Sequence, residues 1–165
     1  MARDYTLREM RLVTEWVVQT YPTAEHRFRV DVGDLKPAMA TTGLSEAELR
    51  LLGRSRRWVD ALVIEPRTVH LIEGKIRLVP GAVAQLELYR DLYGLTPELA
   101  QYRSRDLELH LVYAVEDVAV IRFARGKGIL VHPFHPSWVD EYLAQLRARE
   151  TRGSQPRGLP VPPKP

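Results

Sequence analysis

The chain of 165 residues contains no cysteine. This absence excludes disulfides, thiolate zinc sites, iron–sulfur clusters and cysteine nucleophiles. No apolar run approaches the roughly 18 residues that a membrane-spanning helix needs, and the N-terminus lacks the pattern of a signal peptide. With 45% hydrophobic and 27% charged residues, the sequence is typical of an ordinary soluble globular protein with one substantial core.

Two short apolar segments in the middle of the chain are predicted to pair as antiparallel strands. Residues 57–65 and 68–76 are rich in β-branched and aliphatic side chains, and Pro66 indicates a turn between them. A loop that is symmetric about Pro66 and its neighbour places Asp60 directly opposite Glu73. Because both faces of both segments are largely apolar, we expect central strands that are covered on two sides.

Asp60 and Glu73 would then bring two negative charges together, and directly opposed like charges destabilise a strand pair. A divalent cation is the simplest compensation, because carboxylate oxygens suit Mg²⁺ or Mn²⁺. Lys75 lies two residues after Glu73 on the same face of the strand, so its ammonium can reach the same point. The alternative interpretation is that all three are solvated charges at the ends of strands.

A helix is predicted to follow the second strand, from Ala82 to Tyr93, with Gly94 as its C-cap. On this helix Gln85 and Tyr89 are four residues apart, so they are neighbours on one face. The helix that follows Asp60, Glu73 and Lys75 in the chain thus presents two polar side chains on one face.

The ordered set Asp60, then Glu73-Gly74-Lys75, then Gln85-x-x-x-Tyr89 resembles the PD-(D/E)XK nuclease superfamily, in particular its RecB-type branch. The resemblance covers about residues 53–93. It implies an α/β, restriction-endonuclease-like core in the order αβββαβ, in which a central mixed β-sheet is flanked by helices. A further αβ unit and a C-terminal helix would complete the fold.

The resemblance also implies an activity, the Mg²⁺- or Mn²⁺-dependent hydrolysis of DNA. Asp60, Glu73 and the backbone carbonyl of Gly74 would hold the metal, and Lys75 would position the attacking water or stabilise the developing charge. Gln85 and Tyr89 would line the site, and cleavage would leave a 5′-phosphate and a 3′-hydroxyl. The rival hypothesis is a non-catalytic assembly or structural component, for example one derived from a phage, that keeps the nuclease fold. The location that these hypotheses imply is the cytoplasm of a bacterial or phage-infected cell, or the inside of a phage particle.

The family often carries a further glutamate on its first helix, and Glu15 is the counterpart that we considered. The sequence predicts this helix from Leu7 to Tyr21, with a capping box formed by Thr6 and Glu9. The expected buried stripe consists of Leu7, Met10, Thr14, Val17, Val18 and Tyr21. Glu15 falls at the edge of this stripe, and a solvated ion pair with Arg11 is the simpler interpretation of it.

The rest of the chain supplies the further αβ unit. Residues 107–114 alternate as a strand, and residues 129–133 are predicted to return parallel to it. Asp117 can cap a helix between them that ends near Arg125, although a strand over residues 118–123 is an alternative. An amphipathic helix from Trp138 to about Arg149 would be the last element.

The five histidines are not expected to bind a metal. His132 and His135 are three residues apart on a stretch broken by proline, and no third ligand lies nearby in the sequence. His26, His70 and His110 are interpreted as structural residues.

Contacts with DNA need local positive charge. The candidates lie around the predicted site, at Arg54, Arg56, Arg57, Arg77 and Arg90. A surface of solvated ion pairs is the alternative interpretation. The net charge of +3 comes largely from the C-terminal region, so the remaining body is close to neutral.

We expect one nuclease-like domain over residues 1–150, with a helical insertion at residues 34–53. A basic, proline-rich tail over residues 151–165 would follow. The tail cannot bury enough apolar surface to order itself. We therefore expect it to contact a protein partner or a second copy of the chain.

Overall fold

The computed structural model describes residues 2–33, 43, 45 and 57–153. By its contacts the chain divides into two compact units, residues 1–135 and residues 136–165. The second unit contains helix α6 (Trp138–Gly153), which begins where predicted and ends four residues later than predicted. Most of the insertion expected at residues 34–53 and of the tail at residues 151–165 lies outside the described residues. The boundaries expected at residues 34, 53 and 150 therefore stay predictions.

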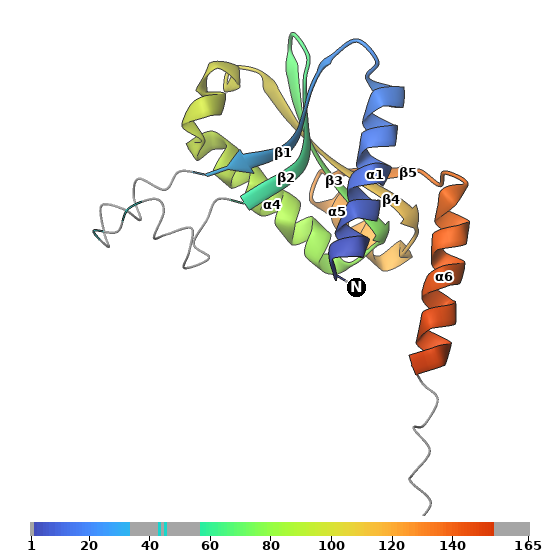
Figure 1. The fold of residues 1–165 in the computed structure, drawn as a ribbon. Coiled ribbons are helices and arrows are strands. Elements are labelled where there is room, and N and C mark those ends of the chain that lie inside the picture. Colours follow the sequence, from blue (N-terminus) through green and yellow to red (C-terminus); the bar gives the residue numbers. More distant parts are fainter. Residues whose placement is uncertain (1, 34–42, 44, 46–56, 154–165) are drawn as a thin grey trace, which may run out of the picture. The chain divides into compact units, whose positions relative to one another are not determined.

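The first unit is α/β, and the order of its elements is the expected one (Figure 1). The strand alternative for residues 118–123 is wrong, because these residues lie in a helix. In chain order the elements are α1 (Ala2–Thr20), β1 (Glu25–Val32), β2 (Arg57–Ile64), β3 (Thr68–Arg77), α4 (Pro80–Leu95), the short 3-10 helix η1 (Pro97–Tyr102), β4 (Asp106–Val115), α5 (Val118–Gly126) and β5 (Leu130–Pro133).

The five strands form one mixed sheet in the order β1-β2-β3-β4-β5. β1, β2 and β3 are antiparallel neighbours, whereas β4 runs parallel to β3 and β5 runs parallel to β4. The predicted register of β2 and β3 is confirmed, since Ala61 lies opposite Ile72 and Leu62 lies opposite Leu71. β3 is buried over most of its length, as expected for a central strand.

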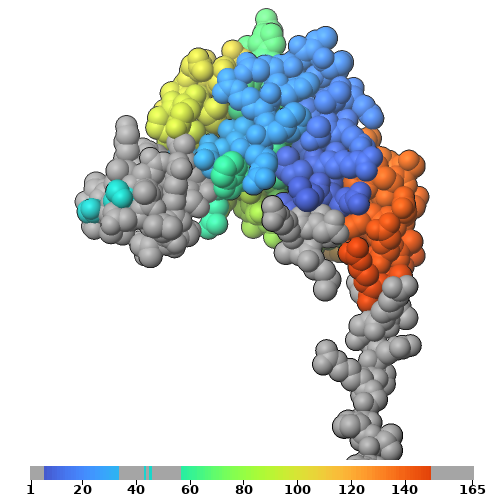
Figure 2. Space-filling view, viewed as in Figure 1, coloured from blue at the N-terminus to red at the C-terminus, as the bar shows by residue number. Residues whose placement is uncertain are grey.

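Helices cover both faces of the sheet (Figure 1). α1 packs mainly on β3 and β2 on one face, and α4 and α5 lie over the other. In the space-filling view, residues of α1 and β1 form much of the surface on the α1 side (Figure 2). The α4 side holds the largest apolar cluster, whose fully buried members include Leu62, Leu71, Leu86 and Leu111. Because helices cover both of its faces, the central strand β3 is held in a fixed position between α1 and α4.

The predicted start of the first helix was wrong, and of its predicted buried stripe only Val17 is buried. α1 begins at Ala2, so Thr6 lies inside the helix and cannot act as its N-cap. Leu7 is 61% exposed and Val18 is 52% exposed, because the helix turns a different stripe toward the sheet. That stripe consists of Glu9, Leu12, Val13, Trp16 and Val17.

Two predicted helix caps had different outcomes. α4 continues through Gly94 to Leu95, and its last turn is closed by Thr96, whose hydroxyl donates to the carbonyl of Leu92 at 2.8 Å. The predicted cap at Asp117 is confirmed, since its carboxylate accepts the backbone N–H groups of Ala119 and Val120 at 2.9 and 3.1 Å.

Candidate metal centre

The predicted site lies where β2 and β3 stop pairing. Their paired positions end at Ala61 and Ile72, one residue short of Asp60 and Glu73. Beyond this point the Gly74 backbone N–H donates to Oδ2 of Asp60 at 3.0 Å instead of to the β2 backbone. The Asp60 side chain thus takes over a hydrogen bond that the strand pair would otherwise make, which fixes its carboxylate beside β3.

Glu73 and Lys75 meet at the same place on β3. Lys75 Nζ lies 2.6 Å from Oε1 of Glu73, and the two side chains are only 14% and 3% exposed. The structure therefore brings Asp60, Glu73 and Lys75 together, as the strand register predicted. A buried ion pair of this kind stabilises the fold only where its remaining polar atoms are also satisfied.

A third carboxylate, which the sequence analysis did not assign to the site, comes from α1. Oε2 of Glu9 lies 3.7 Å from Lys75 Nζ, and the Glu9 side chain is 11% exposed. The sequence contained a signal for it, because Glu9 lies one turn before Val13 on the apolar stripe of α1. The apparent capping box hid this signal by giving Glu9 another role.

Glu15, which the family resemblance suggests as a further metal ligand, does not face this centre. Its Oε1 accepts from Arg11 Nε at 2.7 Å on the exposed side of α1, which is the solvated pair that the sequence also allowed. Glu9, six residues earlier in the chain, is the glutamate of α1 that faces Lys75.

Burial dominates the electrostatics of the three carboxyl groups. It raises the pKa of Glu9 to about 7 and the pKa of Glu73 to about 8, and it also raises the pKa of Asp60. Mutual repulsion adds to the shift at Glu73, where the charges of Asp60 and Glu9 both act. Burial alone would lower the pKa of Lys75, but the surrounding carboxylates raise it overall, so Lys75 stays an ammonium at neutral pH.

The centre is short of positive charge and of hydrogen-bond donors. Oε1 of Glu9 and Oε2 of Glu73 are buried and have no hydrogen-bond partner among the described residues. Buried carboxylate oxygens without a partner are costly, and a divalent cation is what such oxygens bind well. The donor set therefore fits Mg²⁺ or Mn²⁺. The carboxylate oxygens are not gathered within 4.8 Å of one another, and the Lys75 ammonium contacts two of the three groups.

Gln85 and Tyr89 lie next to one another on α4, as predicted. Nε2 of Gln85 donates to the Tyr89 hydroxyl at 3.3 Å. Burial and then the charges of Glu73 and Asp60 raise the pKa of Tyr89, which places its hydroxyl in the field of the carboxylates. Both side chains line a surface hollow of about 270 Å³ that Arg57 also borders.

The β1 strand adds a cation that the sequence analysis did not single out. Arg29 occupies the register position opposite Asp60, and its φ of 52° interrupts the regular pairing there. Positive φ at a residue other than glycine is uncommon and costs free energy. The Arg29 guanidinium lies 5.2 Å from the centre of the Trp58 ring, and its charge acts on Asp60. Trp58 itself is 50% exposed.

The predicted DNA-contacting arginines are spread over different surroundings. Arg57 borders the hollow, and Arg77 is exposed at the end of β3. Arg90 lies near Glu87 and Asp91, at 3.7 and 3.8 Å, as in the ion-paired surface that was the alternative interpretation. Arg54 and Arg56 lie outside the described residues.

Comparison with models of known protein families, with curated proteins and with solved structures found no match. Within the described ranges, no helix combines the length and apolar character that crossing a bilayer requires.

Proposed function

We propose that this protein is a metal-dependent deoxyribonuclease of the PD-(D/E)XK type that acts in the cytoplasm. One observation carries the proposal, the grouping of two buried carboxylates, the part-buried carboxylate of Asp60 and an ammonium near the point where β2 and β3 separate. Two of those carboxylates have an oxygen without a partner, so the fold keeps acidic groups buried at a cost in stability. A metal-binding function explains that cost.

Asp60, Glu73 and Glu9 are the side chains that would hold the ion, with the Gly74 carbonyl as a further ligand. When bound, Mg²⁺ or Mn²⁺ supplies Lewis acidity, which lowers the pKa of a water and neutralises charge on the scissile phosphate. The Gly74 N–H orients the Asp60 carboxylate from behind. Lys75 would position the attacking water or stabilise the negative charge that develops on the phosphate.

The surroundings of the centre suit a nucleic acid. Arg57, Gln85 and Tyr89 border the hollow and offer a cation and polar groups for a phosphate or a sugar. Trp58 precedes Asp60 on the same face of β2, and half of its surface is exposed. An exposed indole beside basic residues can stack on an unpaired base, which favours single-stranded or frayed DNA as the substrate.

The test is cleavage of linear, circular and branched DNA by the purified protein with Mn²⁺ or Mg²⁺. We expect Asp60→Asn and Lys75→Met to lower the rate by about 10²-fold or more, because each removes a group that acts on the transition state. Glu9→Gln should also lower the rate. Glu15→Gln is the matched control on the same helix and should cleave like the parent.

Circular dichroism spectra of all variants show whether the fold is kept. Equal cleavage by the parent, Asp60→Asn and Lys75→Met would reject the nuclease assignment. If Mn²⁺ binds but no DNA is cleaved, the rival hypothesis of a non-catalytic assembly component, with a partner at the proline-rich tail, is favoured instead.

A further inference from the structure

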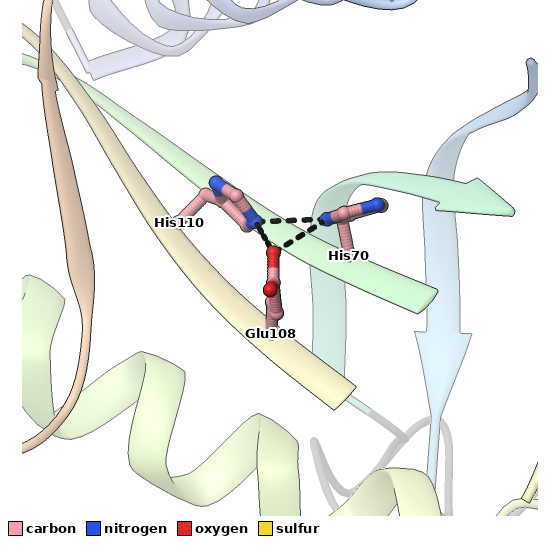
Figure 3. A group of neighbouring side chains, drawn as sticks. All are labelled: His70, Glu108 and His110. Carbon is pink, nitrogen blue, oxygen red and sulfur yellow. Dashed lines mark hydrogen bonds and ion pairs between the residues drawn. The ribbon is translucent and has the colours of Figure 1, made fainter. Parts of the chain in front are cut away.

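A second group of metal-ligand side chains lies on the α1 side of the sheet, away from the three carboxylates. His70 is on β3, and Glu108 and His110 are on β4. The parallel register places Glu108 opposite His70 and places His110 two residues further along, on the same face. Figure 3 shows that a ring nitrogen of each histidine and one oxygen of Glu108 point toward a common centre.

The three ligand atoms form a nearly equilateral triangle. His70 Nδ1 lies 2.9 Å from His110 Nε2, and Oε2 of Glu108 lies 3.2 Å from the first and 3.3 Å from the second. A tetrahedral ion with bonds of about 2.0 to 2.1 Å holds its ligands about 3.3 Å apart. The observed spacing is therefore that of one face of a coordination sphere.

Hydrogen bonds alone do not satisfy the three ligand atoms well. If both rings are neutral and His70 donates its Nε2–H to Glu65, the Nδ1 atom of His70 has no proton. It then faces Glu108 Oε2, which is also an acceptor, at 3.2 Å. A single proton on His110 Nε2 would then have to serve two acceptors, whereas a bound dication satisfies all three atoms at once.

Both histidines have the outer partners that metal-bound imidazoles commonly have. The far nitrogen of His70 lies 2.9 Å from the carboxylate of Glu65, and the far nitrogen of His110 lies 2.9 Å from Nε2 of His132. Such contacts fix the tautomer of a ligand and turn its other nitrogen toward the metal. Burial, followed by the charges of His70 and His132, lowers the pKa of His110 to about 3.

We propose that His70, Glu108 and His110 form a site for a zinc-class dication, separate from the Mg²⁺ or Mn²⁺ centre. Two imidazoles and one carboxylate suit Zn²⁺, Co²⁺ or Fe²⁺ better than Mg²⁺, which prefers oxygen ligands. The fourth position remains for water or an exogenous ligand. The ion would join β3 to β4 through side chains near the start of each strand.

The two histidines of this site are shielded from solvent by aromatic rings, whereas Glu108 is partly exposed. The Tyr21 ring lies 4.9 Å from the His70 ring, and the Trp16 ring lies 4.7 Å from the His132 ring. The side chains of His70 and His110 are 5% and 3% exposed, whereas that of Glu108 is 45% exposed. An ion can therefore reach the histidines past Glu108 without unfolding of the sheet.

The test uses the full chain and measures binding of Zn²⁺ by calorimetry and of Co²⁺ by its visible absorption. We expect one ion per chain at this site, a raised melting temperature, and Co²⁺ bands of a site with nitrogen ligands. Glu108→Gln should weaken binding at least 10-fold, and Glu65→Gln should weaken it by roughly 10- to 100-fold through His70. The control is Glu116→Gln, which changes an exposed glutamate directly after β4 and should bind both ions like the parent.

Two further comparisons separate this site from the carboxylate centre. Asp60→Asn should keep the Zn²⁺ and Co²⁺ binding, and excess Mg²⁺ should not displace either ion from the histidines. The proposal is overturned if neither ion binds, or if Glu108→Gln and Glu65→Gln bind both ions as tightly as Glu116→Gln does. In that case the histidines form a proton-linked chain with Glu65 and Glu108.

Discussion

At the scale of single residues, Glu9 shows how one side chain can be assigned a wrong role from its neighbours in sequence. Its spacing from Thr6 matches a capping box, and this pattern accounts for a glutamate near the start of a helix. The structure places Thr6 inside α1 and Glu9 against Lys75. Asp60, Glu73 and Lys75 could be predicted because they are close in sequence and share one hairpin. Glu9 was missed because the capping-box pattern gave it another role, and Arg29 could not be predicted because the pairing of β1 with β2 places it.

The raised pKa values predict how the stability of the metal-free protein depends on pH. Folded Glu73 and Glu9 hold their protons to about pH 8 and pH 7, whereas an ordinary glutamate has a pKa near 4.5. The contribution of these two groups to the free energy of unfolding is therefore largest below about pH 4.5. It is lost as the pH rises through their folded pKa values of about 7 and 8. We expect the melting temperature in EDTA to fall between about pH 7 and 8.5, and to fall less in Glu73→Gln.

The melting temperature is best compared above pH 7, because at lower pH the buried His110 changes the stability in the opposite direction. The lowered pKa of His110 gives stability that is lost as pH falls below about 6.5 and is constant above it. Glu15→Gln is the control and should follow the parent at every pH. A parent curve that is flat or rising across this window, parallel to that of Glu73→Gln, would contradict the buried-carboxylate account.

At the scale of elements, the hairpin of β2 and β3 was predictable in register as well as in type. Its loop is short, and in a hairpin the length of the loop fixes which residues of the two strands face one another. The orientation of α1 was not predictable in the same way, because Leu7 and Val18 make its exposed side apolar too. What fixes α1 is a close approach to β3 at Gly74, which involves residues about 60 positions apart in the chain.

Gly74 is predicted to be required by this packing. A Cβ atom there would overlap Cγ2 of Val13 and would lie 3.3 Å from the Glu9 carbonyl oxygen. We expect Gly74→Ala to lower the free energy of unfolding by about 1 to 3 kcal/mol, as overpacking of a core does. Unfolding in urea measures this change.

The matched control is Gly94→Ala, because no atom of the described residues lies within 4 Å of a Cβ atom at that position inside α4. This change should stabilise the protein by about 0.5 to 1 kcal/mol, since alanine favours a helix. Adding Val13→Ala to Gly74→Ala should reduce the cost of the glycine substitution. If Gly74→Ala is as harmless as Gly94→Ala, α1 does not pack on β3 as described.

At the scale of the whole first unit, the sheet carries two candidate centres with different chemistry. One gathers carboxylates from α1, β2 and β3, and the other gathers histidines and Glu108 from β3 and β4. The order of elements could be predicted from periodicity, turns and the family resemblance. The histidine group could not, because His70 and His110 are 40 residues apart and only the parallel pairing of β3 and β4 joins them.

The measurement that tests the central claim most directly is a titration of thermal stability with MnCl₂ at about pH 8. We expect the parent and Glu15→Gln to gain about 2.7 kcal/mol when Mn²⁺ exceeds its Kd a hundredfold. Glu9→Gln should gain less, and Glu73→Gln should gain nothing. Equal gains in all four proteins, or no gain in the parent, would contradict the proposal that Glu9, Asp60 and Glu73 hold a divalent cation.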